Sequence, residues 1–231
     1  MDKIKVIAFD ADDTLWDNQS YYDKAEKVFT DNLSEYGSEE ELSERLFHVE
    51  SDNMPLLGYG AKAVCISMME AALSFSDYKL SQEKLSAVLA GAKALLSIPA
   101  DPLPGVAEAL ARIKASGKYR MVVLTKGDLL DQENKLERSG LAGFFDRIVI
   151  VSNKGRKEYM DLCESEGCTP EEFLMVGNSF KSDIKPVIEI GAYGVHIPAK
   201  MWRHEIVEEF PHPNMKKLGS FNELPGLLDI L

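Results

Sequence analysis

Hydrophobic residues follow two different patterns along the chain, and the change between them divides the sequence. Residues 4–9 form a short apolar run rich in β-branched and aromatic side chains, which predicts a buried parallel strand. From about residue 19 to residue 96 the apolar positions recur at helical spacing, with turn signals at Gly37, Pro55 and residues 76–77. We therefore expect only helices in this second stretch.

Strands and helices alternate after residue 104. A helix is predicted to begin after Gly105 and to end at Gly117. Further strands are predicted at residues 120–124, 147–151, 173–176 and 194–197, with helices between them at 129–139, 156–166 and 184–190. Such alternation indicates a parallel sheet with helices on both faces. The predicted fold class is α/β, with a Rossmann-like doubly wound core and an inserted all-helical cap.

The length of the chain fits this two-part organisation. A chain of 231 residues is long enough for one large domain or for a core with a smaller insert. We expect a catalytic core domain from residues 1–16 plus 98–231 and a helical cap domain from residues 17–97.

Charge limits the range of partners. The chain has 26 Lys and Arg against 38 Asp and Glu, a formal net charge of -12. An acidic surface repels nucleic acids and anionic membranes, so we expect neither as a partner. A small phosphorylated substrate remains compatible, because a local cationic site outweighs the average field.

Cysteine usage and the N-terminal residues bear on the compartment. Cys65, Cys163 and Cys168 cannot all pair within one chain, and their spacing resembles no zinc site. The apolar run at residues 4–9 is too short for a signal peptide, and no apolar stretch has the length of a membrane span. We expect a cytoplasmic protein with reduced thiols.

Residues capable of chemistry follow several of the predicted strands. They lie in residues 10–14 (DADDT), 124–127 (LTKG) and 177–183 (GNSFKSD), with Lys154 or Lys157 after the third strand. Ligands of open α/β sheets bind at the carboxyl ends of the strands, so these segments are expected to meet there.

The residue types match the needs of phosphoryl transfer. Asp10 can attack phosphorus to form an aspartyl phosphate, while Asp12 can protonate the leaving oxygen and later activate water. Thr125 offers a hydroxyl near backbone N–H groups, and a nearby lysine neutralises charge. Asp183 supplies a carboxylate ligand for Mg²⁺. Phosphoryl transfer depends mainly on such positioning and neutralisation.

The ordered set resembles the phosphatase branch of the haloacid dehalogenase superfamily, whose motifs read DxDx[TV], hhh[ST], a lysine and a final acidic motif. The resemblance covers the whole chain, with a helical cap inserted after the first motif. It implies that Asp10 is nucleophile and metal ligand, that Asp12 is the acid/base with its main-chain carbonyl on the metal, and that Thr125 and Asp183 complete the second and fourth motifs.

Three positions need comment. We favour Lys154 as the third-motif lysine, with Lys157 as the alternative. Asn178 stands where the family more often has Asp, and its carbonyl oxygen is still able to coordinate a metal at the loss of one negative charge. Lys126, beside Thr125, is a further candidate for substrate binding.

The predicted activity is that of a Mg²⁺-dependent phosphatase acting on a small phosphorylated metabolite through an aspartyl phosphate. A phosphomutase or a 2-haloacid dehalogenase on the same fold, or a non-catalytic binding protein, are the alternatives. Asp12 argues against the dehalogenase, because a halide leaves without a proton. A phosphomutase uses the same catalytic set and is not separated from a phosphatase by these motifs.

Overall fold

A computed structural model describes residues 3–230 and divides the chain into two compact units. The first comprises residues up to Gln19, then Ala100–Lys126, then residues from Leu136 onward. The second comprises Ser20–Pro99 together with Gly127–Lys135. The latter segment contains most of helix α6 (Leu129–Arg138), which the sequence analysis had placed with the core. The predicted domain boundaries stay a prediction.

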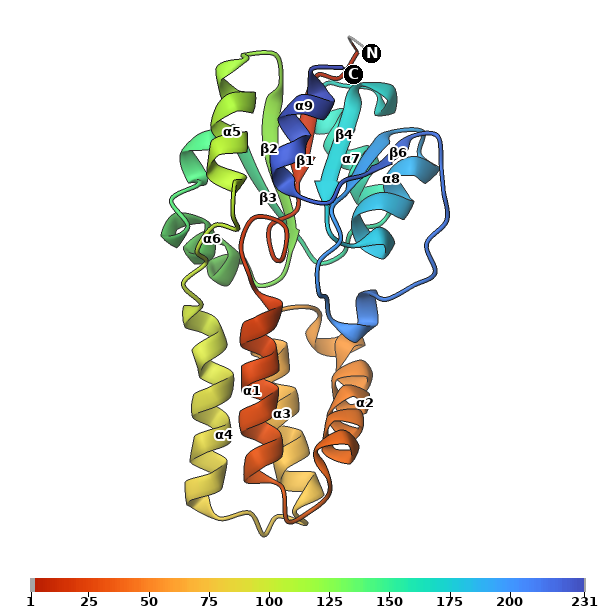
Figure 1. The fold of residues 1–231 in the computed structure, drawn as a ribbon. Helices are drawn as coiled ribbons and strands as arrows, with labels where there is room; N and C mark the ends of the chain where they lie inside the picture. Colours follow the sequence, from red (N-terminus) through yellow and green to blue (C-terminus); the bar gives the residue numbers. More distant parts are fainter. Residues whose placement is uncertain (1–2, 231) are drawn as a thin grey trace. The chain divides into compact units, whose positions relative to one another are not determined.

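A parallel sheet forms the centre of the first unit, with strand order β3-β2-β1-β4-β5-β6 (Figure 1). Its strands are β1 (Val6–Phe9), β2 (Arg120–Lys126), β3 (Arg147–Val151), β4 (Phe173–Gly177), β5 (Tyr193–His196) and β6 (Met215–Lys217). Every neighbouring pair runs parallel. The order reverses on either side of β1, which is the topology of a doubly wound sheet. The predicted fold class is confirmed.

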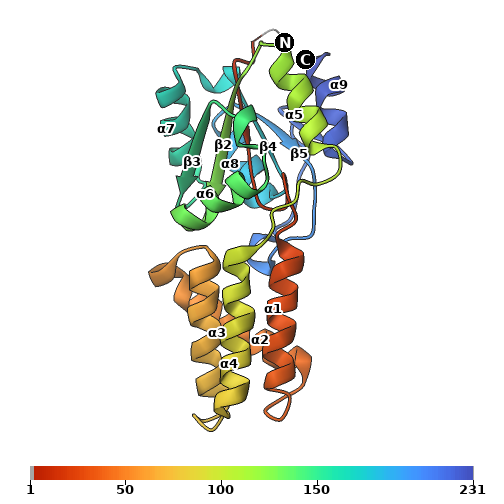
Figure 2. The same ribbon diagram turned by 90° about the vertical axis from the view of Figure 1, so that its left-hand side faces the viewer.

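Helices cover both faces of this sheet, because alternate strand residues point to opposite sides. Ile7 and Phe9 pack toward one face, while Val6 and Ala8 pack toward the other, and all four are buried. Figure 2 shows the helices of the two faces: α5 (Val106–Ala115) and α9 (Leu224–Leu228) on one, α7 (Arg156–Glu166) and α8 (Lys185–Glu189) on the other.

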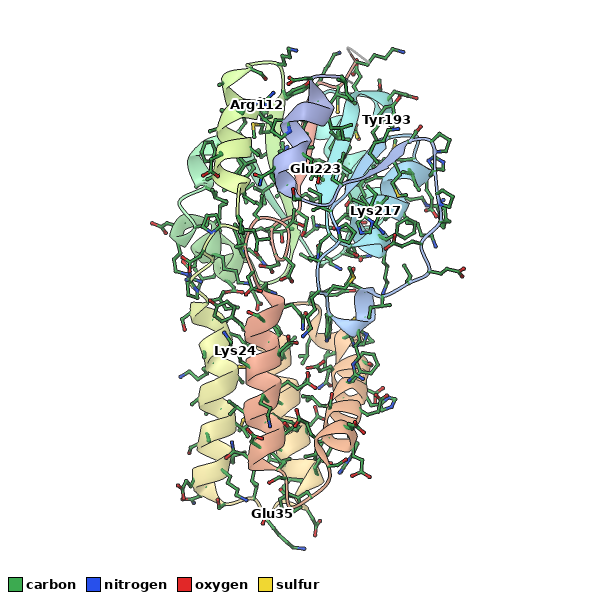
Figure 3. All side chains as sticks on the ribbon, in the orientation of Figure 1. Lys24, Glu35, Arg112, Tyr193, Lys217 and Glu223 are labelled. Carbon is green, nitrogen blue, oxygen red and sulfur yellow. The ribbon has the colours of Figure 1, made fainter. Side chains whose placement is uncertain are left out.

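Figure 3 labels Arg112 on α5. Its guanidinium forms an exposed ion pair with Asp229, just after α9. The sequence analysis did not predict β6 (Met215–Lys217), which adds the outermost strand beside β5. Its three residues carry two lysines and no apolar alternation, so they lack the signal of a buried strand.

Apart from the α6 segment, the second unit consists mainly of four long helices, with no strand among its described residues. They are α1 (Gln19–Asn32), α2 (Glu39–Leu57), α3 (Ala61–Phe75) and α4 (Gln82–Ala94). The helices lie side by side as a bundle (Figures 1 and 2), and each contributes to a common apolar core that includes Phe29, Leu42, Met68 and Ala92. This is the helical stretch that the spacing of apolar residues predicted.

One expected turn in this bundle is wrong. Pro55 lies inside α2, which continues to Leu57 and ends at Gly58 with φ of 72°. Proline has no N–H to donate to the carbonyl of Ser51 four residues back, so α2 lacks one backbone hydrogen bond there and still continues for another two residues. The start of α2 has a capping box, in which Ser38 and Glu41 exchange side-chain and backbone hydrogen bonds.

Within residues 3–230, no helix combines the length and the apolar character that crossing a bilayer requires.

Candidate active site

The predicted site residues come from the carboxyl ends of strands in the first unit. Asp10 follows β1, and Thr125 and Lys126 end the neighbouring β2. Because Phe9 pairs with Val123 in parallel register, Asp10 and Thr125 emerge at the same edge of the sheet. The turn after β4, on the other side of β1, carries Asp183 to that edge as well.

A buried lysine joins two of these carboxylates. Lys154 Nζ forms an ion pair with Asp10 Oδ1 and a second one, 2.8 Å long, with Asp183 Oδ1. The side chains of Lys154 and Asp183 are 1% exposed. The alternative third-motif residue, Lys157, is exposed and pairs with Asp161 one helical turn away at 2.6 Å. The structure thus brings Lys154 to Asp10 and leaves Lys157 on the surface.

Thr14 connects the nucleophile candidate to the fourth motif. Its hydroxyl donates to Asp10 Oδ2 at 2.9 Å and lies 3.3 Å from Asn178 Oδ1. Thr14 was part of the DADDT motif, but the sequence analysis gave it no role. The threonine or valine position of the family motif was the available signal, and here a hydroxyl at that position holds Asp10 in one orientation.

The Asp12 carboxylate is held by an aromatic side chain. Trp16 Nε1 donates a hydrogen bond to Asp12 Oδ1 at 2.8 Å, and the Trp16 side chain is fully buried. Between them Asp13 adopts φ of 60° and accepts from the backbone N–H groups of Asn18 and Gln19. Burial raises the pKa of Asp13 to about 7, although those two hydrogen bonds oppose the shift. Asp13 thus ties the loop that carries Asp10 and Asp12 to the backbone of residues 18 and 19.

Thr125 and Lys126 differ in their surroundings. Thr125 is 2% exposed, and its hydroxyl lies 3.4 Å from the carbonyl oxygen of Lys126. The Lys126 ammonium points to the segment after β4, where it donates to Ser182 Oγ, and to Glu205 Oε1, both at 2.8 Å. The sequence analysis did not identify Glu205, because nothing in its neighbourhood resembles a catalytic motif.

The turn after β4 is tightly built around Asp183. Residues Phe180–Ile184 form a single π-helical turn, a distortion often found at functional sites. Ser179 N–H donates to Asp183 Oδ2 at 3.0 Å. A Cβ atom at Gly177 would lie 2.3 Å from that same oxygen, so only glycine fits there. The hydroxyl of Tyr159, from α7, donates to the carbonyl of Ser182 at 2.9 Å.

Electrostatics at the centre leave an excess of negative charge. Burial raises the pKa of Asp10 to about 7; Lys154 opposes this shift, and repulsion from Asp183 and Asp12 adds to it. Burial alone would lower the pKa of Lys154, but the two flanking carboxylates outweigh it and raise the pKa above the usual value. A permanent ammonium therefore faces two acidic groups, and one ammonium cannot balance both.

This donor set fits a hard divalent cation. Asp10, Asp183 and the amide of Asn178 offer oxygen atoms within one connected network, and a cation would relieve the uncompensated charge. The described part of the chain contains no group of three or more His, Cys, Asp or Glu side chains arranged to hold a metal. Main-chain and amide oxygens would therefore have to complete the coordination.

Comparison with known proteins identifies the family. The family model for haloacid dehalogenase-like hydrolases matches residues 4–191. The chain belongs to this family. The predicted resemblance is confirmed, and the match covers both the first motif and the turn that carries Asp183.

Relatives of this family member span its whole length. The chain is 26% identical to the glyceraldehyde 3-phosphate phosphatase of Methanocaldococcus jannaschii over 99% of this chain and 97% of that protein. Its match to the enzyme of the same name from Methanothermobacter thermautotrophicus is 31% identical but covers only 46% of this chain and 47% of that protein. A solved haloacid dehalogenase-like hydrolase from Xanthomonas campestris is 33% identical, with a TM-score of 0.88 over 99% of this chain and 91% of that one. The predicted enzyme class, a phosphoric monoester hydrolase of this family, is confirmed.

Structures of 2-haloacid dehalogenases also match. The one from Xanthobacter autotrophicus has a TM-score of 0.66 at 18% identity, over 98% of each chain. At that identity the likeness shows a shared fold and leaves the chemistry to be argued from the site.

Proposed function

We propose that this family member is a Mg²⁺-dependent phosphatase that hydrolyses a small phosphorylated metabolite through an aspartyl phosphate on Asp10. The observation that carries the proposal is the buried ammonium of Lys154 between Asp10 and Asp183. A cation in that position holds a carboxylate nucleophile and lowers the repulsion that an incoming phosphate dianion meets.

The first chemical step assigned to these residues is attack on phosphorus. A carboxylate oxygen of Asp10 forms the new P–O bond as the ester P–O bond breaks, and the departing alkoxide takes a proton from Asp12. Thr14 keeps the Asp10 carboxylate aligned through its 2.9 Å hydrogen bond. Thr125 and Lys154 are assigned to the phosphoryl oxygens.

The second step regenerates the enzyme. Water attacks the phosphorus of the aspartyl phosphate and gives a proton to Asp12, the P–O bond to Asp10 breaks, and inorganic phosphate leaves. Bound Mg²⁺ would supply charge neutralisation for the phosphoryl group, held by Asp10, Asp183, the main-chain carbonyl of Asp12 and, as a weaker ligand, Asn178.

The names of the relatives support a small phosphorylated substrate. The proteins from Methanocaldococcus jannaschii and Pyrococcus furiosus, 26% and 25% identical, are both named glyceraldehyde 3-phosphate phosphatase. We therefore include glyceraldehyde 3-phosphate among the first compounds to test. We also propose that residues 17–97 are the cap domain.

The decisive experiment is a phosphate-release assay on a panel of phosphorylated metabolites, with and without Mg²⁺, using wild type and Asp10→Asn. We expect Mg²⁺-dependent release by wild type and a fall in kcat of at least ~10³-fold in the variant, whose fold is retained. Beryllium fluoride should bind only when Asp10 is present. Near wild-type turnover by Asp10→Asn would show that the nucleophile is wrongly assigned.

Asp12 separates phosphate transfer from dehalogenation. Asp12→Ala should slow an alkyl phosphate by about 10²–10⁴-fold and an activated aryl phosphate less, because a stable leaving group needs no proton. Chloride release from a 2-chloroacid that survives in Asp12→Ala would instead support a dehalogenase. Transfer of the phosphoryl group to a second position of the substrate, without release of phosphate, would support a phosphomutase.

A further inference from the structure

A carboxylate from outside the sequence motifs reaches the candidate site. Glu205 ends the short turn Arg203–Glu205, in the segment between β5 and β6, and its side chain is 11% exposed. It accepts hydrogen bonds from Lys126 Nζ at 2.8 Å and from the hydroxyls of Ser179 and Ser182, each at 2.6 Å. One side chain therefore ties the end of β2 to the turn that follows β4.

The contact with Lys126 is an ion pair away from solvent. Burial lowers the pKa of Lys126, and Glu205 opposes this shift. Burial alone would raise the pKa of Glu205, but Lys126 and the two serine hydroxyls hold it down at about 2. Glu205 is therefore ionised at neutral pH, and the charge of Lys126 is balanced inside the protein.

The contacts with the two serines bracket the turn that carries Asp183. Ser179 caps this turn by accepting from Ser182 N–H at 3.0 Å, and its own N–H donates to Asp183 Oδ2. Glu205 Oε2 accepts from both hydroxyls at once. Loss of that oxygen would leave two buried hydroxyls to find new partners, and the turn would shift.

We propose that Glu205 is a positioning residue of the phosphatase site, which aims Lys126 and fixes the turn of Asp183 without touching the substrate. The inference rests on the proposed function. It also changes the role expected of Lys126: its ammonium is paired with a protein carboxylate, so it contributes a fixed dipole at the site edge rather than a full positive charge.

The test compares Glu205→Gln, Lys126→Met and the double variant, with Glu208→Gln as control. Glu208 is exposed in the same segment and carries the same charge. Each protein is assayed with p-nitrophenyl phosphate over a range of Mg²⁺ concentrations, and its thermal midpoint is measured separately. The midpoint needs no catalysis, so it reports on the ion pair even in an inactive protein.

We expect Glu205→Gln to lower kcat/KM at least ~10-fold and to raise the Mg²⁺ concentration for half-maximal rate several-fold, because the turn of Asp183 moves. Its midpoint should fall by about 6 °C or more, since a buried ammonium loses its partner. The double variant should regain most of that midpoint without regaining activity, and Glu208→Gln should match wild type.

Two results would overturn the inference. In the first, wild type is active and Glu205→Gln has the same kcat/KM and the same Mg²⁺ requirement, so that Glu205 has a purely structural role. The other is a double variant in which the two midpoint losses simply add, because the residues would then be independent. If wild type itself releases no phosphate from any ester, the proposed function fails instead.

Discussion

Replacing Lys154 by methionine would test the charge arrangement at the centre of the site. Methionine fills a similar volume but carries no charge, so Asp10 and Asp183 would face each other in a buried position without a cation. Removing one partner from a buried ion pair destabilises a protein by about 3–5 kcal/mol, because the remaining charge stays unpaired. Here the side chains concerned are 1% to 11% exposed, so solvent screens them little.

The expected loss is large enough to measure in two ways. For a chain of this length, about 3–5 kcal/mol corresponds to a fall in the midpoint of thermal unfolding of roughly 6–20 °C. The assay is thermal or urea unfolding at pH 7.5 with a metal chelator present, so that the charge balance depends on the protein alone. Activity on any substrate accepted by wild type should fall at least ~10³-fold.

A second variant tests whether the loss of stability in Lys154→Met comes from unpaired charge rather than from altered packing. Adding Asp183→Asn to Lys154→Met removes the second negative charge, so the double variant should be more stable than Lys154→Met alone. Lys157→Met serves as the control, because Lys157 is exposed and pairs only with Asp161 on the same helix. A Lys154→Met protein with wild-type stability and activity, or a larger activity loss in the control, would refute the reasoning.

Three other outcomes follow from the site. Asp183→Ala should raise the Mg²⁺ concentration for half-maximal phosphate release more steeply than Asn178→Ala, since a carboxylate binds the cation more strongly than an amide; the reverse order would exchange their roles. Trp16→Phe removes the 2.8 Å hydrogen bond from Trp16 Nε1 to Asp12 Oδ1 and should lower kcat for an alkyl phosphate by about 5-fold with KM unchanged; stopped assays on both proteins decide it. The pKa of Glu205 falls from 4.5 to about 2 on folding, so its stabilising contribution is complete above pH 4.5 and is lost as pH falls toward 2. Urea unfolding should therefore show the stabilities of wild type and Glu205→Gln converging as pH falls from about 5 to 3.

Much of the core was predictable because its strands are apolar and its turns are marked by glycine. Val122 and Val176, for example, lie in runs that are buried on both sides of the sheet, and such runs are recognisable without a structure. Asp10 and Asp183 were predictable for a related reason: parallel strands bring their carboxyl ends together, so position relative to a strand is enough to place a side chain.

What the sequence did not reveal depends on long-range contacts. The bonds from Glu205 to Lys126, Ser179 and Ser182 join segments far apart in the chain, and no local pattern marks them. At Pro55 the local turn signal gave a wrong prediction, because the residue lies inside helix α2. Local chemistry predicts elements well, but it does not predict which polar side chains meet across them.

The central place of β1 has a consequence for synthesis on the ribosome. Strand β1 cannot pair until Arg120 has been made for one edge and Phe173 for the other, because Val6 pairs with both. The helical bundle between them consists of local contacts and can form while β1 waits, which brings the two ends of the insert together and shortens the loop that must close. Asp10 cannot contact Lys154 until residue 154 has been made, and the site stays incomplete until the turn that carries Asp183 follows.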